Sequence, residues 1–251
     1  MMDEKLIISR AESIAKFAHV LIDNMSPPTT KPDRPRVALF LTICEQFEAA
    51  LLLIRSGMAS HASVHVRSML EALVAMNLLG KHNNYVDQMM YSQLKGEKKI
   101  YEGLIQEGEL PQELQPFVQG RLNNCKPRFD ALHAEGFRPK NIGNEILDAG
   151  LADLLGPYSM LCGFSHNDLA VLALRHQGDE SMTYMAPTPS KVIITILSIA
   201  LRIIVAVTEP LSKIALFPAG LFDAVFGEMN KAWSDVLAQA ESGAAEAEFS
   251  I

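Results

Sequence analysis

The sequence predicts an all-α protein, a multi-helix bundle without a significant β-sheet. Apolar residues recur close to the helical period over most of the chain, no segment alternates like a strand, and prolines and glycines separate the periodic segments. The chain has 251 residues, 49% of them hydrophobic, which suffices for one large core. We therefore expect a single all-helical domain over residues 1–251.

The first third of the chain predicts three apolar helices separated by breaks. Apolar positions in Glu4 to Asn24 follow the helical period, and SPPTTKPDRP then predicts a Pro-rich loop over residues 26–35. A strongly apolar helix is expected over Val37 to Ser56. Gly57 ends or bends this helix, and a further apolar helix should run from about Ala59 to Leu79.

The middle of the chain is more polar. Asn83 to Gln106 carries mixed charges and predicts a solvent-facing helix. The prolines at positions 111, 116, 127 and 139 predict that the following segment is divided into short helices and loops. From Arg121 to Lys140, lysine and arginine exceed aspartate and glutamate by three, which suits either a phosphate-facing patch or an ordinary solvated surface.

The last third predicts two short apolar helices, one strongly apolar helix and a closing amphipathic helix. These helices are expected over Tyr158 to Phe164, Asn167 to Arg175, Val192 to Val207 and Phe222 to Ala240. Residues 176–190 should form a loop, and residues 241–251 a flexible acidic tail.

The segment Val192 to Val207 is apolar enough to raise the question of a membrane span. It has sixteen residues, fewer than the roughly 20 that a spanning helix needs, and Arg202 interrupts it. Its polar neighbours trace a single narrow stripe. We therefore expect a helix packed on most sides within the bundle, and no membrane partner.

Composition restricts the class of function. The net charge of −7 argues against a protein that coats nucleic acid, although a local basic patch remains compatible with it. Three scattered cysteines without a C-x-x-C pair suit a reduced, cytoplasmic location. Glycine-rich phosphate loops and the H-E-x-x-H metal motif are absent from the sequence, so no cofactor and no metal site are expected.

Charged residues within an apolar helix are the most informative feature. Arg67 and Glu71 lie four residues apart in a segment that is apolar on nearly every side. Burying such charges is costly unless they are paired. They suit either a structural ion pair that fixes helix register or the floor of a polar pocket, where Arg67 presents its guanidinium to a phosphate and Glu71 orients it.

His166 is the candidate for proton transfer. It lies in FSHND, which predicts a helix start capped by Ser165 or Asn167. The positive end of that helix would lower the pKa of His166 and favour the neutral imidazole that a general base requires. A purely structural histidine at a helix start is the alternative.

A family pattern is carried by two segments, LLLIRSGMASHASVHVRSMLEALVAMNLL and LLGPYSMLCGFSHNDLAVL, at Leu51 to Leu79 and Leu154 to Leu172. The first resembles a glycine, small-residue and R-S-x-x-E-A stretch, and the second a tyrosine, serine and histidine segment, of an uncharacterised group of bacterial all-helical domains. These domains are similar to the HEPN superfamily (higher eukaryotes and prokaryotes nucleotide-binding).

The resemblance implies that Arg67 and Glu71 face the His166 segment across the bundle, with Tyr158 and Ser165 beside it. HEPN ribonucleases use an arginine followed after four to six residues by a histidine, paired across a dimer. No arginine stands at that spacing before His166, and between Arg55 and His61, which do have it, Gly57 intervenes.

Two functions therefore stay open. The first is a HEPN-like bacterial protein that binds or cleaves RNA or a nucleotide in stress or phage defence. His166, Arg67 and Glu71 are its candidate catalytic residues, and Tyr158, Ser165, Asn167 and Arg202 its candidate binding residues. The alternative is a non-catalytic helical interaction or ligand-sensing module, in which Arg67 and Glu71 form a structural ion pair. A homodimer is expected in either case.

Overall fold

The computed structural model describes residues 3–29, 32–106, 110–166, 168–178 and 181–248, with side chains described as far as Glu241. Within these residues the fold is all-α and contains no β-strand, which confirms the predicted fold class. The helices are α1 (Glu4–Asn24), α2 (Asp33–Arg55), α3 (Ala59–Lys81), α4 (Tyr85–Gln106), α5 (Gln115–Ala134), α6 (Ile142–Asp148), η1 (Ala152–Leu154), α7 (Leu155–Ser165), α8 (Leu169–His176), α9 (Ser190–Thr208), η2 (Glu209–Lys213) and α10 (Leu221–Glu248).

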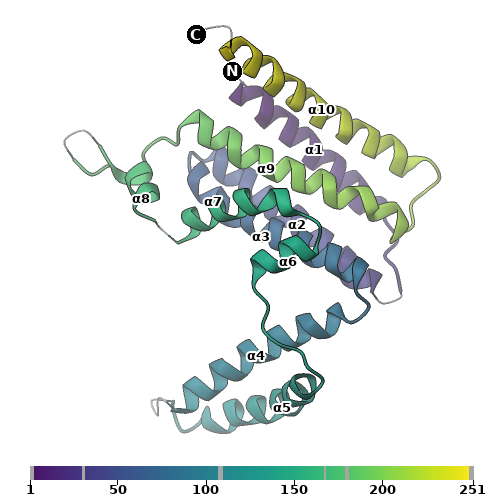
Figure 1. Cartoon of the computed structure of the whole chain (residues 1–251), viewed down its shortest axis with the longest axis vertical. Coiled ribbons are helices and arrows are strands. Elements are labelled where there is room, and N and C mark those ends of the chain that lie inside the picture. Colours follow the sequence, from purple (N-terminus) through teal and green to yellow (C-terminus); the bar gives the residue numbers. More distant parts are fainter. Residues whose placement is uncertain (1–2, 30–31, 107–109, 167, 179–180, 249–251) are drawn as a thin grey trace.

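The body of the molecule is a bundle around α3 and α9. α10, α1 and α9 run side by side, and α3 packs against α2, α7 and α9 (Figure 1). Met69 and Leu73 of α3 and Ile196 and Leu201 of α9 are fully buried. α1 buries one face at three- and four-residue steps, as its apolar period predicted, and Asp3 caps its amino terminus.

The turn from α2 to α3 positions the start of the helix that carries Arg67. Gly57 adopts a φ of 76°, and its amide donates to the carbonyl of Ile54, while the Met58 amide donates to Leu53. Glycine reaches this left-handed conformation without a Cβ penalty, so α2 ends here and α3 can return along it.

α4 and α5 form an arm that projects from the body (Figure 1). Its inner side is held by stacked rings of Tyr91, Phe129 and His133. The prediction that prolines divide this region into short pieces is wrong for residues 115–134, which form one helix. Pro116 occupies the first turn, where its missing amide costs little, and Pro127 lies on an exposed face, where water can satisfy the freed carbonyl.

The ends of two helices differ from the sequence expectation. α2 begins at Asp33, inside the segment for which a loop was expected, because Pro35 falls in the first turn, where no intrahelical amide is needed. α10 continues to Glu248, through most of the segment expected to be a flexible tail. Alanine and glutamate, which dominate these residues, favour a helix.

α2 and α9 are long and apolar enough to cross a membrane by length and composition alone. α9 packs against α1, α3 and α10, and more than half of its apolar window is buried in the bundle. The polar stripe, which includes Lys191, Thr195 and Arg202, faces solvent. Burial within the core therefore accounts for the hydropathy of α9, as its sequence pattern predicted.

Candidate functional site

Arg67 and Glu71 form the base of a polar cluster on α3. The Arg67 Nε donates to Glu71 Oε1 at 3.0 Å. The two residues are one helical turn apart, the spacing at which side chains on one face meet. The side chains are 25% and 41% exposed, so the pair is only partly buried and its charges remain within reach of water.

Tyr158 of α7 links this helix to the Arg67–Glu71 pair on α3. Its hydroxyl donates to Glu71 Oε1 at 3.2 Å and lies 3.4 Å from Arg67 Nη2. The Arg67 guanidinium carbon also lies 5.5 Å from the centre of the Tyr158 ring, within the range of a cation–π contact. Because α7 packs directly on α3, a residue 87 positions from Glu71 holds its carboxylate.

His166 borders the same cluster from the solvent side. Its Nε2 lies 3.4 Å from Arg67 Nη1, and the residue is exposed. The expected helix start at His166 is wrong, because this residue is the carboxyl-terminal cap of α7 and Asp168 is the amino-terminal cap of α8. The premise that His166 lies at a helix amino terminus therefore does not hold.

The local electrostatics favour a charged arginine and a protonated tyrosine. Burial opposes the guanidinium charge, but the charge of Glu71 and its hydrogen bond outweigh it, so the pKa of Arg67 is raised. Burial, a side-chain hydrogen bond with Cys162 and the charge of Glu71 raise the pKa of Tyr158 to about 12. At neutral pH the cluster thus presents a fixed cation beside a hydroxyl donor.

Ser165 and Arg202 do not join this cluster. Ser165 is the last residue of α7 and donates to the Leu161 carbonyl, so it does not cap α8. Arg202 of α9 forms an ion pair with Asp153 of η1 and has no hydrogen bond or ion pair with the cluster in the described structure. Asn167 lies outside the described residues.

Sequence reasoning missed Arg175 of α8. Arg175 is 7% exposed, and its Nε donates to Ser60 Oγ at 3.1 Å. Its Nη2 donates to the carbonyls of Ser60 and Phe164. One side chain thus joins α8 to the start of α3 and to α7 two residues before His166. An arginine within the otherwise apolar segment LAVLALRH was the available signal.

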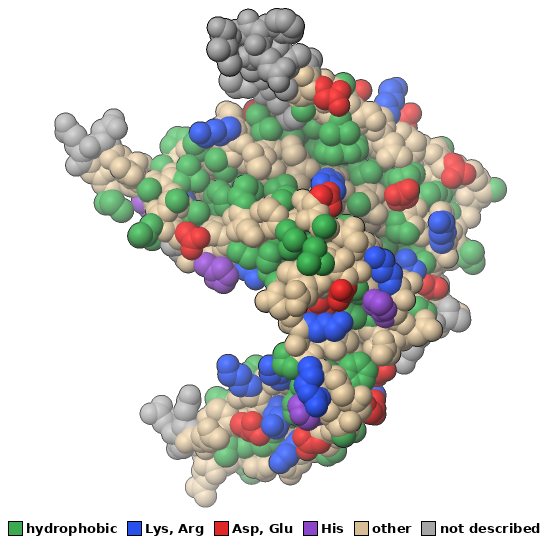
Figure 2. Space-filling view, in the orientation of Figure 1, with side chains coloured by type: hydrophobic (Ala, Val, Ile, Leu, Met, Phe, Trp, Pro, Cys, Tyr) green, Lys and Arg blue, Asp and Glu red, His purple; other side chains and the backbone are tan. Residues whose placement is uncertain are grey.

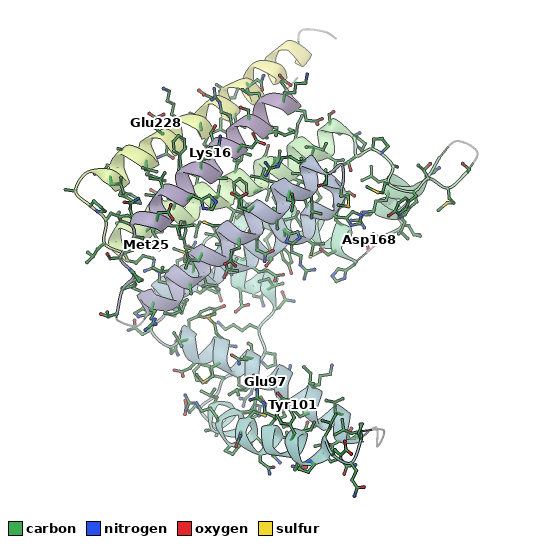
Figure 3. The ribbon with its side chains drawn as sticks, turned by 180° about the vertical axis from the view of Figure 1, so that it is seen from behind. Lys16, Met25, Glu97, Tyr101, Asp168 and Glu228 are labelled. Carbon is green, nitrogen blue, oxygen red and sulfur yellow. The ribbon has the colours of Figure 1, made fainter. Side chains whose placement is uncertain are left out.

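The surroundings of the cluster are open. The space-filling view shows a hollow between the body and the α4–α5 arm, with Lys and Arg side chains along the arm's margin (Figure 2). Asp168, two residues after His166, lies on the body above this open side, across from Glu97 and Tyr101 of the arm (Figure 3). The described chain contains no group of three or more His, Cys, Asp or Glu side chains that could hold a metal ion.

This arrangement combines a phosphate-binding group with a proton carrier. A guanidinium held in place by a carboxylate and a phenol is suited to pairing with phosphate oxygens. An exposed imidazole beside it is a group that can accept and donate protons. Two segments distant in sequence supply these groups: the middle of α3, and α7 with its carboxyl-terminal cap.

Comparison with known proteins covers the region that contains this cluster. Residues 34–183, from α2 to the loop after α8, match the model of a family described as a family of unknown function, DUF5677. The match includes Arg67, Glu71, Tyr158, His166 and Arg175. No curated protein and no solved structure matches the chain. Because the family model spans more than half of the chain, the protein belongs to DUF5677, a family of unknown function.

Proposed function

We propose that this protein binds RNA through its phosphate backbone and cleaves it at the cluster of Arg67, Glu71, Tyr158 and His166. The observation that carries the proposal is the convergence of Arg67 and His166, whose Nη1 and Nε2 lie 3.4 Å apart at a partly exposed position. The resemblance of both segments to HEPN-like domains supports RNA as the substrate. Bacterial stress or phage defence, in the cytoplasm, is the setting that this resemblance suggests.

The proposed reaction needs only groups that the chain supplies. Neutral His166 takes the proton of a ribose 2′-hydroxyl, and the 2′ oxygen attacks the adjacent phosphorus. The bond from phosphorus to the 5′ oxygen breaks, and that oxygen takes a proton from water. The hydroxide that remains takes back the proton held by His166, which restores the neutral imidazole. The products are a 2′,3′-cyclic phosphate and a 5′-hydroxyl end. Arg67 stabilises the charge that develops on the phosphate oxygens.

The shape and charge of the surroundings are compatible with a single strand of RNA. Overall charge opposes binding, because the chain carries −7. The basic margin of the α4–α5 arm across the hollow in Figure 2 supplies a local positive surface. Binding should therefore be salt-sensitive and depend on this local surface.

A second candidate function is favoured by one observation. Each nitrogen of the Arg67 guanidinium has a protein neighbour, with Nε at Glu71, Nη1 at His166 and Nη2 at Tyr158. A guanidinium with a protein neighbour at each of its three nitrogens suits a clamp between α3 and α7 in a non-catalytic interaction module. In that case RNA is not a substrate, and the apolar helices serve a homodimer or another protein partner.

Incubation of the purified protein with single-stranded RNA at low salt tests the proposal. The wild-type protein should bind and cleave the RNA, and Arg67→Gln and His166→Gln should lose cleavage. Arg10→Gln is the matched control, because Arg10 forms a comparably exposed ion pair with Asp235 between α1 and α10. Intact RNA without binding, or equal cleavage by the His166→Gln variant, would contradict the proposal.

The expected homodimer remains a proposal of its own. The HEPN pattern pairs two active sites across a dimer, and a second copy would add a second cluster to the same RNA. Sedimentation of the purified chain at several concentrations tests this. A monomer at concentrations at which RNA is cleaved would contradict it.

A further inference from the structure

A second cavity lies beside the start of α3, separate from the Arg67 cluster. Its volume is about 280 Å³, and it is a partly open cavity bordered by the first turn of α3, the end of α8 and the loop that precedes α9. The lining residues are Gly57, Met58, Ser60, His61, Arg175, His176, Tyr184, Met185, Ala186 and Thr188. The proposed cleavage of RNA at the Arg67 cluster does not use this cavity.

The cavity has a basic end. Arg175, His61 and His176 line it together, and the lining residues that the structure describes include no aspartate or glutamate. Burial, followed by the positive charges of Arg175 and His176, lowers the pKa of His61. Such surroundings favour a bound anion and disfavour a cation.

The basic groups are held in fixed positions. The Arg175 guanidinium is anchored on Ser60, through both its hydroxyl and its carbonyl. His176 is held by a contact of its Nδ1 with the Thr183 carbonyl at 3.2 Å, and the Thr183 amide donates to the His176 carbonyl. In a preorganised site of this kind, the side chains lose little conformational entropy when a ligand binds.

The remaining walls are largely apolar. They are provided by Met58, Tyr184, Met185 and Ala186. Met185 has a φ of 56°, the one positive value for a residue other than glycine in the described chain. Strained backbone of this kind persists where surrounding structure enforces it, and it clusters at ligand-binding loops.

We propose that this cavity binds a small organic carboxylate whose apolar or aromatic body lies against Tyr184 and Met185 and whose carboxylate faces Arg175 and His61. The volume equals that of about nine water molecules. This suits a body of the size of a benzene ring with one carboxylate. The proposal does not depend on RNA cleavage.

The position of Arg175 links this ligand to the cluster on α3 and α7. Its Nη2 donates to the Phe164 carbonyl at 3.3 Å, two residues before His166. A carboxylate bound beside the same guanidinium would therefore lie next to the segment that carries His166. The cavity is thus in a position to regulate whatever activity the cluster has.

Calorimetric titration of the full chain with benzoate tests the proposal, with benzamide as the neutral analogue of similar shape and inorganic phosphate as the anion without an apolar body. We expect saturable binding of benzoate and affinities at least about tenfold weaker for the other two, a difference of about 1.4 kcal/mol. Equal affinity for benzoate and benzamide would overturn the anionic part of the proposal. Equal affinity for benzoate and phosphate would overturn the apolar part.

Three variants test whether benzoate binds in this cavity. His61→Gln should weaken benzoate binding by about tenfold, the loss of one charge-assisted hydrogen bond. Ala186→Leu should fill the cavity and abolish binding while leaving all basic groups in place. His82→Gln, the same change at the opposite end of α3, should bind as the wild type does. Unchanged binding in the Ala186→Leu variant would overturn the proposal, and these variants avoid Arg175, whose contacts also hold three helices together.

Discussion

The guanidinium of Arg67 and the imidazole of His166 lie 3.4 Å apart, between Nη1 and Nε2, although 99 positions separate the two residues in sequence. The packing of α7 on α3 creates this proximity, and Tyr158 and Glu71 hold the arginine in place. A cation and an exposed proton carrier thereby share one location.

Replacement of Arg67 distinguishes RNA cleavage from the alternative, a structural clamp. Because the pair with Glu71 is partly exposed, Arg67→Gln should lower the free energy of unfolding by only about 1 kcal/mol. The same change should abolish RNA cleavage, since it removes the guanidinium proposed to pair with the phosphate oxygens. Urea unfolding and cleavage assays on one preparation measure both effects. A loss of several kcal/mol would favour the structural clamp.

His166→Gln should leave stability almost unchanged. His166 is exposed, so the loss of its ring costs little folding free energy. Cleavage should disappear because glutamine cannot accept the proton of the 2′-hydroxyl. Thermal unfolding alongside the cleavage assay provides the check, and a His19→Gln variant, altered at an exposed histidine on α1, should behave as the wild type.

The raised pKa of Tyr158 predicts that the folded protein loses stability at alkaline pH. Its pKa of about 12 in the folded protein exceeds the value of about 10 expected when unfolded. Between these values the unfolded chain has released the proton and the folded chain has not, so stability falls as pH rises from 10 to 12. Burial and a hydrogen bond to Glu145 also raise the pKa of Tyr85.

Tyr158→Phe should therefore reduce, without removing, the decline of unfolding free energy between pH 10 and 12. Denaturant unfolding at a series of pH values measures the decline for both proteins. An identical pH dependence in the variant and the wild type would show that the Tyr158 phenol does not retain its proton in the folded state.

The cysteines should differ in reactivity. Cys44 is buried, and this burial, together with the charges of Glu48 and Glu45, raises its pKa to about 12. Cys162 is only partly buried and its side chain is hydrogen-bonded with Tyr158. A maleimide should therefore label Cys162 first in the native protein, and labelling should reduce RNA cleavage. Mass spectrometry of the digested protein identifies the site, and Cys162→Ala is the control.

The helical architecture could be predicted from local pattern alone, because apolar periodicity and the position of Gly57 are local properties. The apolar residues around Arg67 also indicated correctly that its charge would be held by Glu71. The wrong position of His166 had a specific cause. A serine and an asparagine beside it favour a helix start, but α7 continues through Ser165 and α8 begins only at Leu169.

The proline-rich arm and Arg175 show where local pattern fails. Pro127 was expected to break a helix, but ring stacking between Phe129 and Tyr91 on the partner helix holds α5 together. Arg175 acts through Ser60, 115 positions away, so its role depends on tertiary contacts that no local pattern encodes. The same holds for the cavity that Arg175 lines.

The most direct measurement of the central claim is the chemistry of the RNA ends. The protein is incubated with a single-stranded RNA and, separately, with the same sequence in which every ribose is 2′-deoxyribose, and the fragments are weighed by mass spectrometry. We expect the wild-type protein to produce 2′,3′-cyclic phosphate ends from the RNA and to leave the deoxy strand intact. The His166→Gln variant should leave the RNA intact. Fragments from the deoxy strand, or the same cyclic ends with His166→Gln, would contradict the central claim.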